Sequence, residues 1–166
     1  MAYLDGVHLP ATALDIDEAE WLAVRAALLP QDAVIVHLGV SAGASLVCSR
    51  VGNPTARIVG VDHDVRCAGL DIDADIILAD SRTVAWKRPP DFLFVDADHT
   101  EGSVIADIQN WHGRIVAGGI IAFHDYGNTH FRWCKGVKAA VDGWDWDGWT
   151  EIGAPGSIKA YRKDST

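Results

Sequence analysis

The sequence is poor in basic side chains. Its 166 residues include 14 lysines and arginines against 23 aspartates and glutamates, which gives a formal net charge of -9 at pH 7. Binding of nucleic acid depends mainly on neutralising phosphates, so a chain with this charge balance is not expected to bind nucleic acid.

Cysteine is also scarce. Cys48, Cys67 and Cys134 are widely scattered and form no CxxC pair. This argues against a disulfide framework and against a thiolate zinc site, and it favours a reducing, cytoplasmic setting.

Long apolar runs are missing as well. No uninterrupted run approaches the roughly 20 residues that a membrane-spanning helix needs, and the N-terminal stretch MAYLDGVHLP lacks a basic-then-apolar signal. We therefore expect a soluble protein with no membrane partner. The chain is 49% hydrophobic, enough to bury one core. We expect a single domain over residues 1–166, with a helical segment over 1–30 and a core over 31–166.

Apolar, strand-like runs alternate with segments of helical period along the chain, which predicts an α/β fold. Most of the strand-like runs are near-continuous and end in polar residues, as is typical of parallel strands covered on both faces. Two short runs close to the C-terminus flank a Pro-Gly turn and predict an antiparallel hairpin. The predicted strands are 33–38, 56–62, 74–80, 91–98, 118–126, 149–153 and 156–163, and the predicted helices are about 15–29, 43–50, 100–115 and 133–141.

The stretch VIVHLGVSAGAS is an apolar run that ends in a glycine-spaced turn. In an open parallel sheet such a turn lies at the switch point, where ligands bind. A dinucleotide fingerprint would require glycine at Ser41, and the chain has no GK[ST] phosphate loop. Asp62 ends the next strand, where a carboxylate can accept hydrogen bonds from both ribose hydroxyls. We therefore expect an adenosine-type ligand without phosphate at the turn, although tight packing alone also explains Gly39 and Gly43.

Three motifs resemble those of one known family. The stretches HLGVSAGAS, DFLFVDADHTEGSVIADI and GGIIAFHDY, followed by GVKAAVD, are similar in order and spacing to EIGxxxGxS, DFxFxDGDHxYxxVxxDL and GGxxxxHDY. These are motifs of a small group of class I S-adenosylmethionine-dependent methyltransferases. The resemblance runs from about Val34 to the C-terminal strand. It implies a Rossmann-like, doubly wound, mostly parallel sheet of seven strands, with S-adenosylmethionine as the cofactor.

The resemblance also implies where the cofactor lies. Gly39 and Gly43 would wrap its methionyl and ribose portions, and Asp62 would hold the ribose. His37 stands where the family has an acid, and a neutral imidazole anchors an ammonium group less well than a carboxylate does. The full set of expected cofactor contacts is His37, Gly39, Gly43, Ser45, Asp62, His63, Asp80, Ser81 and Asp96.

Polar residues gather where the fourth and fifth predicted strands end. Methyl transfer is an in-line displacement at a sulfonium carbon, so the enzyme must orient the acceptor and remove its proton. We expect His124 to act as base or orienter, with His99 as the second candidate base. The expected catalytic set is His124, Asp96, His99 and Asp125.

Structural roles, rather than catalytic ones, are expected for some neighbouring residues. Asp98 and Asp107 are expected to serve in capping and helix solvation. For His99, a turn residue that caps the helix at Thr100 is an equally weighted alternative to a catalytic role.

A metal is the alternative to a base. Asp96 and Asp125 could hold Mg²⁺, which takes oxygen ligands and would lower the pKa of an acceptor hydroxyl. Related metal-dependent O-methyltransferases have oxygen donors at the positions that match Asp96, His124 and Asp125, and histidine is a poorer ligand of Mg²⁺. Metal dependence is therefore left open, with these three residues as the candidate ligands.

The predicted function is methylation, from S-adenosylmethionine, of a hydroxyl on a small-molecule or sugar-containing acceptor. The family often covers its substrate with an N-terminal lid, and only about one helix is available here. The acceptor would then be large, or covered by a second subunit, so a homo-oligomer is left open.

The missing middle glycine disfavours a nicotinamide-dependent oxidoreductase. A degenerate cofactor-binding or structural protein without activity is the alternative, supported by His37 and the short lid.

Overall fold

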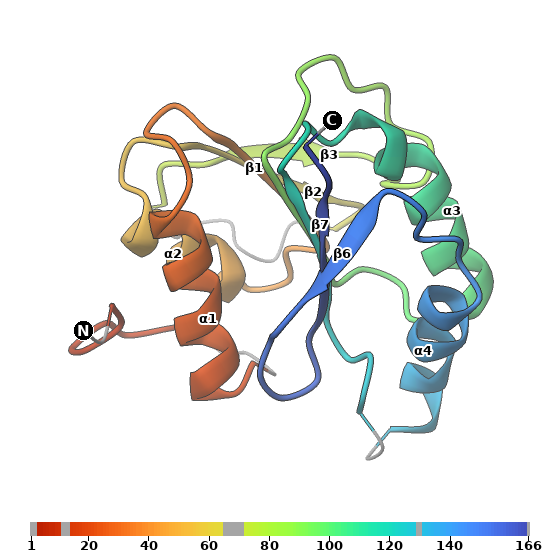
Figure 1. Ribbon diagram of the computed structural model, residues 1–166. Coiled ribbons are helices and arrows are strands. Elements are labelled where there is room, and N and C mark those ends of the chain that lie inside the picture. The colour runs from red at the N-terminus through yellow and green to blue at the C-terminus, as the bar shows by residue number, and fades with distance from the viewer. Residues whose placement is uncertain (1–2, 11–13, 65–71, 129–130, 166) are drawn as a thin grey trace.

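A seven-stranded sheet runs through the middle of the molecule (Figure 1). The computed structural model describes residues 3–10, 14–64, 72–128 and 131–165. The strands lie in the order β3-β2-β1-β4-β5-β7-β6. Their bounds are β1 Val34–Leu38, β2 Arg57–Asp62, β3 Asp75–Leu78, β4 Phe92–Val95, β5 Ile120–Phe123, β6 Trp149–Ile152 and β7 Lys159–Lys163.

The sheet is parallel from β3 to β5 and antiparallel at its other edge. β7 pairs antiparallel with both β5 and β6, which confirms the predicted C-terminal hairpin. Every residue of β1, β4 and β5 is buried, because these strands are covered on both faces, as their continuous apolar sequences predict. The chain leaves β1 toward β2 on one side and later returns to β4 on the other side. This is a topological switch point, and the crevice there lies at the carboxyl ends of the strands.

Helices cover both faces of the sheet (Figure 1). α1 packs with α2, and α3 packs with α4. Alternate residues of β1 face the two layers: Ile35 belongs to the apolar cluster with α1, and Val36 belongs to the cluster with α3. The helices are α1 Ile16–Ala27, α2 Ala44–Gly52, α3 Glu101–Trp111 and α4 Lys135–Asp142, and the 3-10 turns are His112–Arg114 and Arg132–Cys134.

The first turn of α1 is closed by a reciprocal capping box. Asp15 is the N-cap, and its side chain accepts from the backbone of Glu18, while Glu18 accepts the Asp15 backbone N–H at 3.0 Å. The helix predicted over about 15–29 therefore begins as α1 directly after Asp15. The predicted helix over 100–115 ends as an α-helix at Trp111 and continues as a 3-10 turn.

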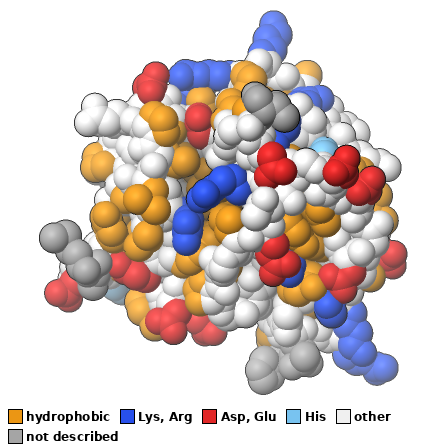
Figure 2. Space-filling model, viewed as in Figure 1, with side chains coloured by type: hydrophobic (Ala, Val, Ile, Leu, Met, Phe, Trp, Pro, Cys, Tyr) orange, Lys and Arg blue, Asp and Glu red, His pale blue; other side chains and the backbone are white. Residues whose placement is uncertain are grey.

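Two of the three cysteines lie in the described part of the chain. Cys48 and Cys134 are buried free thiols, and Cys67 lies outside the described residues. None of the helices in the described ranges has the length and apolarity needed to cross a membrane. On the face seen in Figure 2, acidic and basic side chains are interspersed.

Gly52 allows α2 to pack closely against α1. A methyl group added at this position is therefore expected to lower the stability of the fold. A Cβ at Gly52 would lie 2.0 Å from the carbonyl oxygen of Ala23, so we expect Gly52→Ala to lower the free energy of unfolding by about 1–3 kcal/mol. Gly102→Ala is the matched control, because Gly102 is also helical and a Cβ there meets nothing within 4 Å. It should be neutral or stabilising by up to about 1 kcal/mol. Urea unfolding measures the stability of both variants. A Gly52→Ala variant as stable as the native protein would contradict the packing role assigned to Gly52.

Candidate functional site

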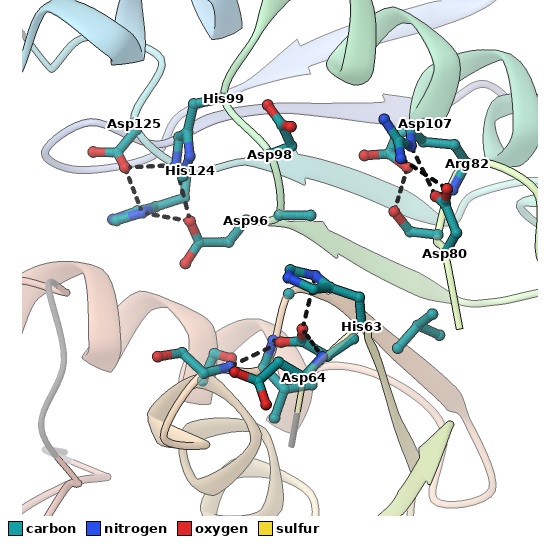
Figure 3. Close-up of a pocket in the computed structure, with 18 of the residues that line it drawn as sticks. His63, Asp64, Asp80, Arg82, Asp96, Asp98, His99, Asp107, His124 and Asp125 are labelled. Carbon is teal, nitrogen blue, oxygen red and sulfur yellow. Dashed lines mark hydrogen bonds and ion pairs between the residues drawn. The ribbon is translucent and has the colours of Figure 1, made fainter. Parts of the chain in front are cut away.

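A pocket opens where the parallel strands end (Figure 3). Its volume is about 960 Å³, at the upper end of the roughly 300–1,000 Å³ typical of small-molecule sites. The walls are the turn after β1, the ends of β2, β4 and β5, and the loop after β3. The crevice that the glycine turn predicts is therefore open.

The glycine turn forms one wall of the pocket. Gly39 has a φ of +82°, and a Cβ there would lie 2.0 Å from the backbone oxygen of Asp96, so only glycine fits. Asp62 holds this turn in place, because its Oδ2 accepts the backbone N–H groups of Val40 at 2.7 Å and Ser41 at 3.1 Å. Burial acts to raise the pKa of Asp62, but these backbone hydrogen bonds and one from Asp64 lower it overall. The carboxylate is therefore charged, and it shapes the turn as well as lining the pocket.

Most of the expected cofactor contacts surround this pocket. Seven of the nine expected contacts line it: Gly39, Ser45, Asp62, His63, Asp80, Ser81 and Asp96. Gly43 is not among the lining residues. It is the N-cap of α2 with a φ of +91°, and it directs the chain from the turn into the helix.

His37 requires a correction. It points from β1 toward α2, and its Nε2 lies 3.0 Å from Ser49 Oγ in the buried interior. Its ring packs edge-on against Phe94, and burial lowers its pKa to about 3, so it is neutral. Strand alternation places the side chain on the α1 and α2 side of the sheet, away from the pocket. His37 is therefore a core residue and is not among the residues that line the pocket.

The opposite wall carries a cluster of carboxylates and imidazoles, here called the Asp-His cluster. Asp96 and His99 follow β4, and His124 and Asp125 follow β5. Figure 3 shows the four side chains converging. Asp125 adopts a φ of +59°, a sparsely populated conformation for a residue other than glycine. The distances are 3.1 Å from His124 Nδ1 to Asp96 Oδ1, 3.5 Å from His124 Nδ1 to Asp125 Oδ2, 2.9 Å from His99 Nε2 to Asp125 Oδ2 and 3.5 Å from His99 Nε2 to Asp96 Oδ1.

Glu18 of α1 also contacts the Asp-His cluster, and sequence reasoning missed it. Its Oε2 lies 3.2 Å from His124 Nε2, and its Oε1 accepts the backbone N–H and the hydroxyl of Ser157 at 2.7 and 2.8 Å. Only 2% of Glu18 is exposed. Burial acts to raise its pKa, but hydrogen bonds from His124, Asp15 and Ser157 lower it to about 2. The pattern DIDE marks Glu18 as a capping residue, and nothing in it indicates the contact with β5.

Two roles are expected for His124, general base or orienter of its neighbours, and this geometry favours the second. Its Nε2 faces Glu18, its Nδ1 faces Asp96 and Asp125, and the residue is 2% exposed. Burial acts to lower its pKa, but the hydrogen bonds to these carboxylates raise it to about 12. A base must present a free nitrogen to the acceptor, and both nitrogens are occupied. In this arrangement His124 orients its neighbours and presents no free nitrogen to an acceptor.

His99 and Asp98 are now distinguished. The Thr100 N–H at the start of α3 is accepted by Asp98 at 2.8 Å, which confirms the capping role of Asp98. His99 does not cap the helix, because its ring points into the Asp-His cluster. Burial acts to lower the pKa of His99, but Asp125 and Asp96 raise it to about 9.

Asp107 is not the solvated helix residue that the sequence predicted. It is 1% exposed, and its Oδ1 accepts the Ser81 hydroxyl at 2.7 Å. The Ser81 carbonyl in turn accepts from Asn110 and Trp111, each at 2.8 Å. These contacts fasten the loop after β3 to α3, beside the pocket. Burial raises the pKa of Asp107 to about 6.

The residues present fit both groups that the resemblance implies. The Gly39 turn has no phosphate-binding glycine pattern, and with Asp62 it suits a nucleoside, while the acidic wall beyond suits a cationic sulfonium. For a metal, Asp96, His124 and Asp125 each offer one ligand atom, and these atoms lie within 4.8 Å of one another. The set includes an imidazole nitrogen, so it fits a nitrogen-accepting divalent metal better than Mg²⁺.

Comparison with known protein families finds one family whose model matches this chain. A family model described as a methyltransferase domain matches residues 36–126, more than half of the chain. The comparison with curated proteins finds no match.

Several solved structures are similar in fold. Cofactor-bound Rv0187 from MTB shows 18% identity and a TM-score of 0.70 over 99% of this chain and 88% of that one. The MycE methyltransferase of the mycinamycin biosynthetic pathway, in complex with Mg, SAH and mycinamycin VI, shows 15% identity and a TM-score of 0.65 over 81% of this chain and 46% of that one. An rRNA methylase from Streptococcus thermophilus shows 15% identity and a TM-score of 0.67 over 93% of this chain and 100% of that one.

The buried carboxyl of Asp107 predicts a pH-dependent contribution to stability. Its pKa is raised on folding from 3.8 to about 6, so the folded state holds the proton more tightly than the unfolded state. The stabilisation is fully present below about pH 4 and is lost as the pH rises through about 6. Asp107→Asn cannot titrate, so its stability relative to the native protein should rise by at most about 3 kcal/mol across this window.

Urea unfolding between pH 4 and pH 7.5 measures this difference. Asp32→Asn is the control, because Asp32 is exposed and its variant should follow the native protein at every pH. A constant difference between native protein and Asp107→Asn would contradict the prediction.

Proposed function

The chain belongs to the methyltransferase domain family, and on this premise we propose that it transfers a methyl group from S-adenosylmethionine to a hydroxyl of a small-molecule or sugar-containing acceptor. Its sheet order with an antiparallel C-terminal hairpin is that of the class I methyltransferase fold, which confirms the fold and the family expected from the three motifs.

One observation carries this proposal: the pocket has two chemically different walls. The wall of Gly39 and Asp62 suits the nucleoside part of the cofactor. The wall of the Asp-His cluster, whose four side chains are labelled in Figure 3, suits the reacting groups. A sulfonium is a cation, and the carboxylates of the cluster favour its approach. Rv0187 and MycE, whose structures hold cofactor or SAH, share this fold, which supports the choice of cofactor.

Asp96 is expected both as a cofactor contact and as a catalytic residue, and of these two roles we assign it the catalytic one, at the acceptor. Its Oδ1 lies within reach of the two histidines, and Figure 3 shows its other oxygen pointing away from them. That oxygen would accept the hydrogen bond of the acceptor hydroxyl and align it for in-line attack. The oxygen–carbon bond forms as the sulfur–carbon bond breaks, and the hydroxyl proton passes to the carboxylate. A divalent metal held by Asp96, His124 and Asp125 would lower the pKa of that hydroxyl.

RNA is the acceptor suggested by the rRNA methylase among the similar structures. The charge of the pocket disfavours it. Within the described ranges, Arg82 is the one arginine or lysine that lines the pocket. Six described aspartates other than Asp107 line the same space: Asp62, Asp64, Asp80, Asp96, Asp98 and Asp125. A phosphate backbone would be repelled from this opening.

Cofactor binding tests the nucleoside wall. Titration calorimetry with S-adenosylmethionine should show binding by the native protein and binding weaker by about 1–3 kcal/mol by Asp62→Ala. The variant loses the hydrogen bonds that hold the turn, and the ribose loses a hydrogen-bond acceptor. Asp75→Ala is the control, because Asp75 is an exposed residue at the start of β3, where it pairs with Arg57. Full affinity in Asp62→Ala would contradict the assigned role.

Turnover tests the second wall. Asp96→Asn should retain cofactor binding and lose methylation by at least 100-fold on a panel of hydroxylated small molecules and sugars, with product followed by mass spectrometry. The panel also includes an RNA transcript. Methylation of RNA alone would overturn the small-molecule acceptor, and cofactor binding without product from any acceptor would favour the degenerate protein.

A further inference from the structure

The Asp-His cluster has the composition and spacing of a transition-metal site. We propose that Asp96, His99, His124 and Asp125 together bind one divalent transition metal through two imidazole nitrogens and two carboxylate oxygens, and that Glu18 fixes the ligating form of His124. This inference rests on the proposed function, because it places the metal in the acceptor half of the pocket. It goes beyond that function by adding His99 and Glu18 and by naming the class of metal.

The spacing of the four polar atoms matches a coordination shell. Around the cluster, nitrogen and oxygen alternate, and the successive separations are 2.9, 3.5, 3.1 and 3.5 Å. Ligand atoms that each lie about 2.0–2.2 Å from a metal stand about 3–3.5 Å apart in tetrahedral or octahedral geometry. One ion at the centre of these atoms would therefore contact all four with little rearrangement.

The chemistry of the donors selects the metal. Mg²⁺ and Ca²⁺ take oxygen ligands, whereas imidazole suits zinc, iron, nickel and copper. Two imidazoles and two carboxylates form a mixed set that zinc, cobalt and manganese also accept. The cluster should therefore prefer Zn²⁺ or Co²⁺ over Mg²⁺.

Glu18 supplies the outer contact that such sites use. Ligating histidines usually donate their other ring N–H to a carboxylate, which fixes the tautomer and makes the ligating nitrogen more basic. His124 Nε2 lies 3.2 Å from Glu18 Oε2, which leaves Nδ1 directed at Asp96 and Asp125. Glu18 is itself held by Ser157 and by the backbone of Asp15.

Asp125 is supported in the same manner. Its Oδ1 accepts from Asn128 Nδ2 at 2.6 Å, while its Oδ2 faces the two histidines. Its positive φ directs the carboxylate into the cluster at a cost of order 1–3 kcal/mol that the surroundings must offset. A strained backbone together with a specific hydrogen bond is consistent with a metal ligand whose carboxylate must point in one direction.

The test measures metal binding directly. After treatment with a chelator, the full chain is titrated by calorimetry with ZnCl₂, CoCl₂, MnCl₂ and MgCl₂ in the absence of S-adenosylmethionine. We expect one equivalent of Zn²⁺ or Co²⁺, bound at least 100-fold more tightly than Mg²⁺. On the native protein, pulsed electron paramagnetic resonance with Mn²⁺ should show nitrogen couplings from imidazole, which requires no variant to fold.

Variants then assign the ligands. His99→Gln and His124→Gln should each weaken Co²⁺ binding by at least 10-fold and reduce the nitrogen coupling seen with Mn²⁺ from that of two imidazoles to that of one, and Glu18→Gln should weaken Co²⁺ binding by about 10–100-fold. His63→Gln is the matched control, because His63 lines the same pocket, its side chain is 90% exposed and its Nδ1 lies 3.4 Å from Asp62. It should leave Co²⁺ affinity unchanged.

Three results would overturn the proposal: no stoichiometric binding of Zn²⁺ or Co²⁺, tighter binding of Mg²⁺, or an absence of nitrogen coupling. In each case the cluster is a network of ion pairs between protonated imidazoles and carboxylates, or a site built on oxygen alone. Binding of S-adenosylmethionine, measured on the same protein, separates this failure from failure of the proposed function. Intact cofactor binding would leave the methyltransferase proposal standing.

Discussion

The contact between Glu18 and His124 is the interaction on which the site depends. A buried carboxylate is costly unless its oxygens are hydrogen-bonded, and the oxygens of Glu18 accept from the Asp15 backbone, from Ser157 and from His124. The same side chain therefore joins the start of α1, the loop before β7 and the end of β5. This junction holds His124 in one orientation, and His124 in turn holds Asp96.

The two walls of the pocket are built in the same manner. On one wall Asp62 accepts backbone N–H groups of the glycine turn, and on the other the cluster carboxylates face imidazole nitrogens. In both places an acid that is available to a ligand also holds the adjoining backbone or side chains in position. Such preorganisation lowers the cost of ordering the site when a ligand binds.

The face of an element on which a residue lies decides its role more than its type does. His37 lies near the carboxyl end of β1 and His124 directly follows β5, yet strand alternation directs His37 into the α2 layer, against Ser49. Asp98 and Asp107 are both acids near α3, yet Asp98 caps the helix while Asp107 is buried against Ser81. A pattern of residue types at strand ends predicts neither distinction, because each depends on the direction in which the side chain points.

The sequence by itself determined the architecture and the location of the pocket. Periodicity, glycine spacing and the acid that ends β2 are local properties, and parallel strands bring their carboxyl ends to one edge wherever they occur. The partners of the buried polar groups were decided only by the tertiary structure. Glu18 lies 106 residues from His124 along the chain, and its capping pattern is complete without that contact. Whether an imidazole is a base, a ligand or a core residue depends on which atoms face its two nitrogens, and those atoms come from elements that meet only when the sheet and its helices pack.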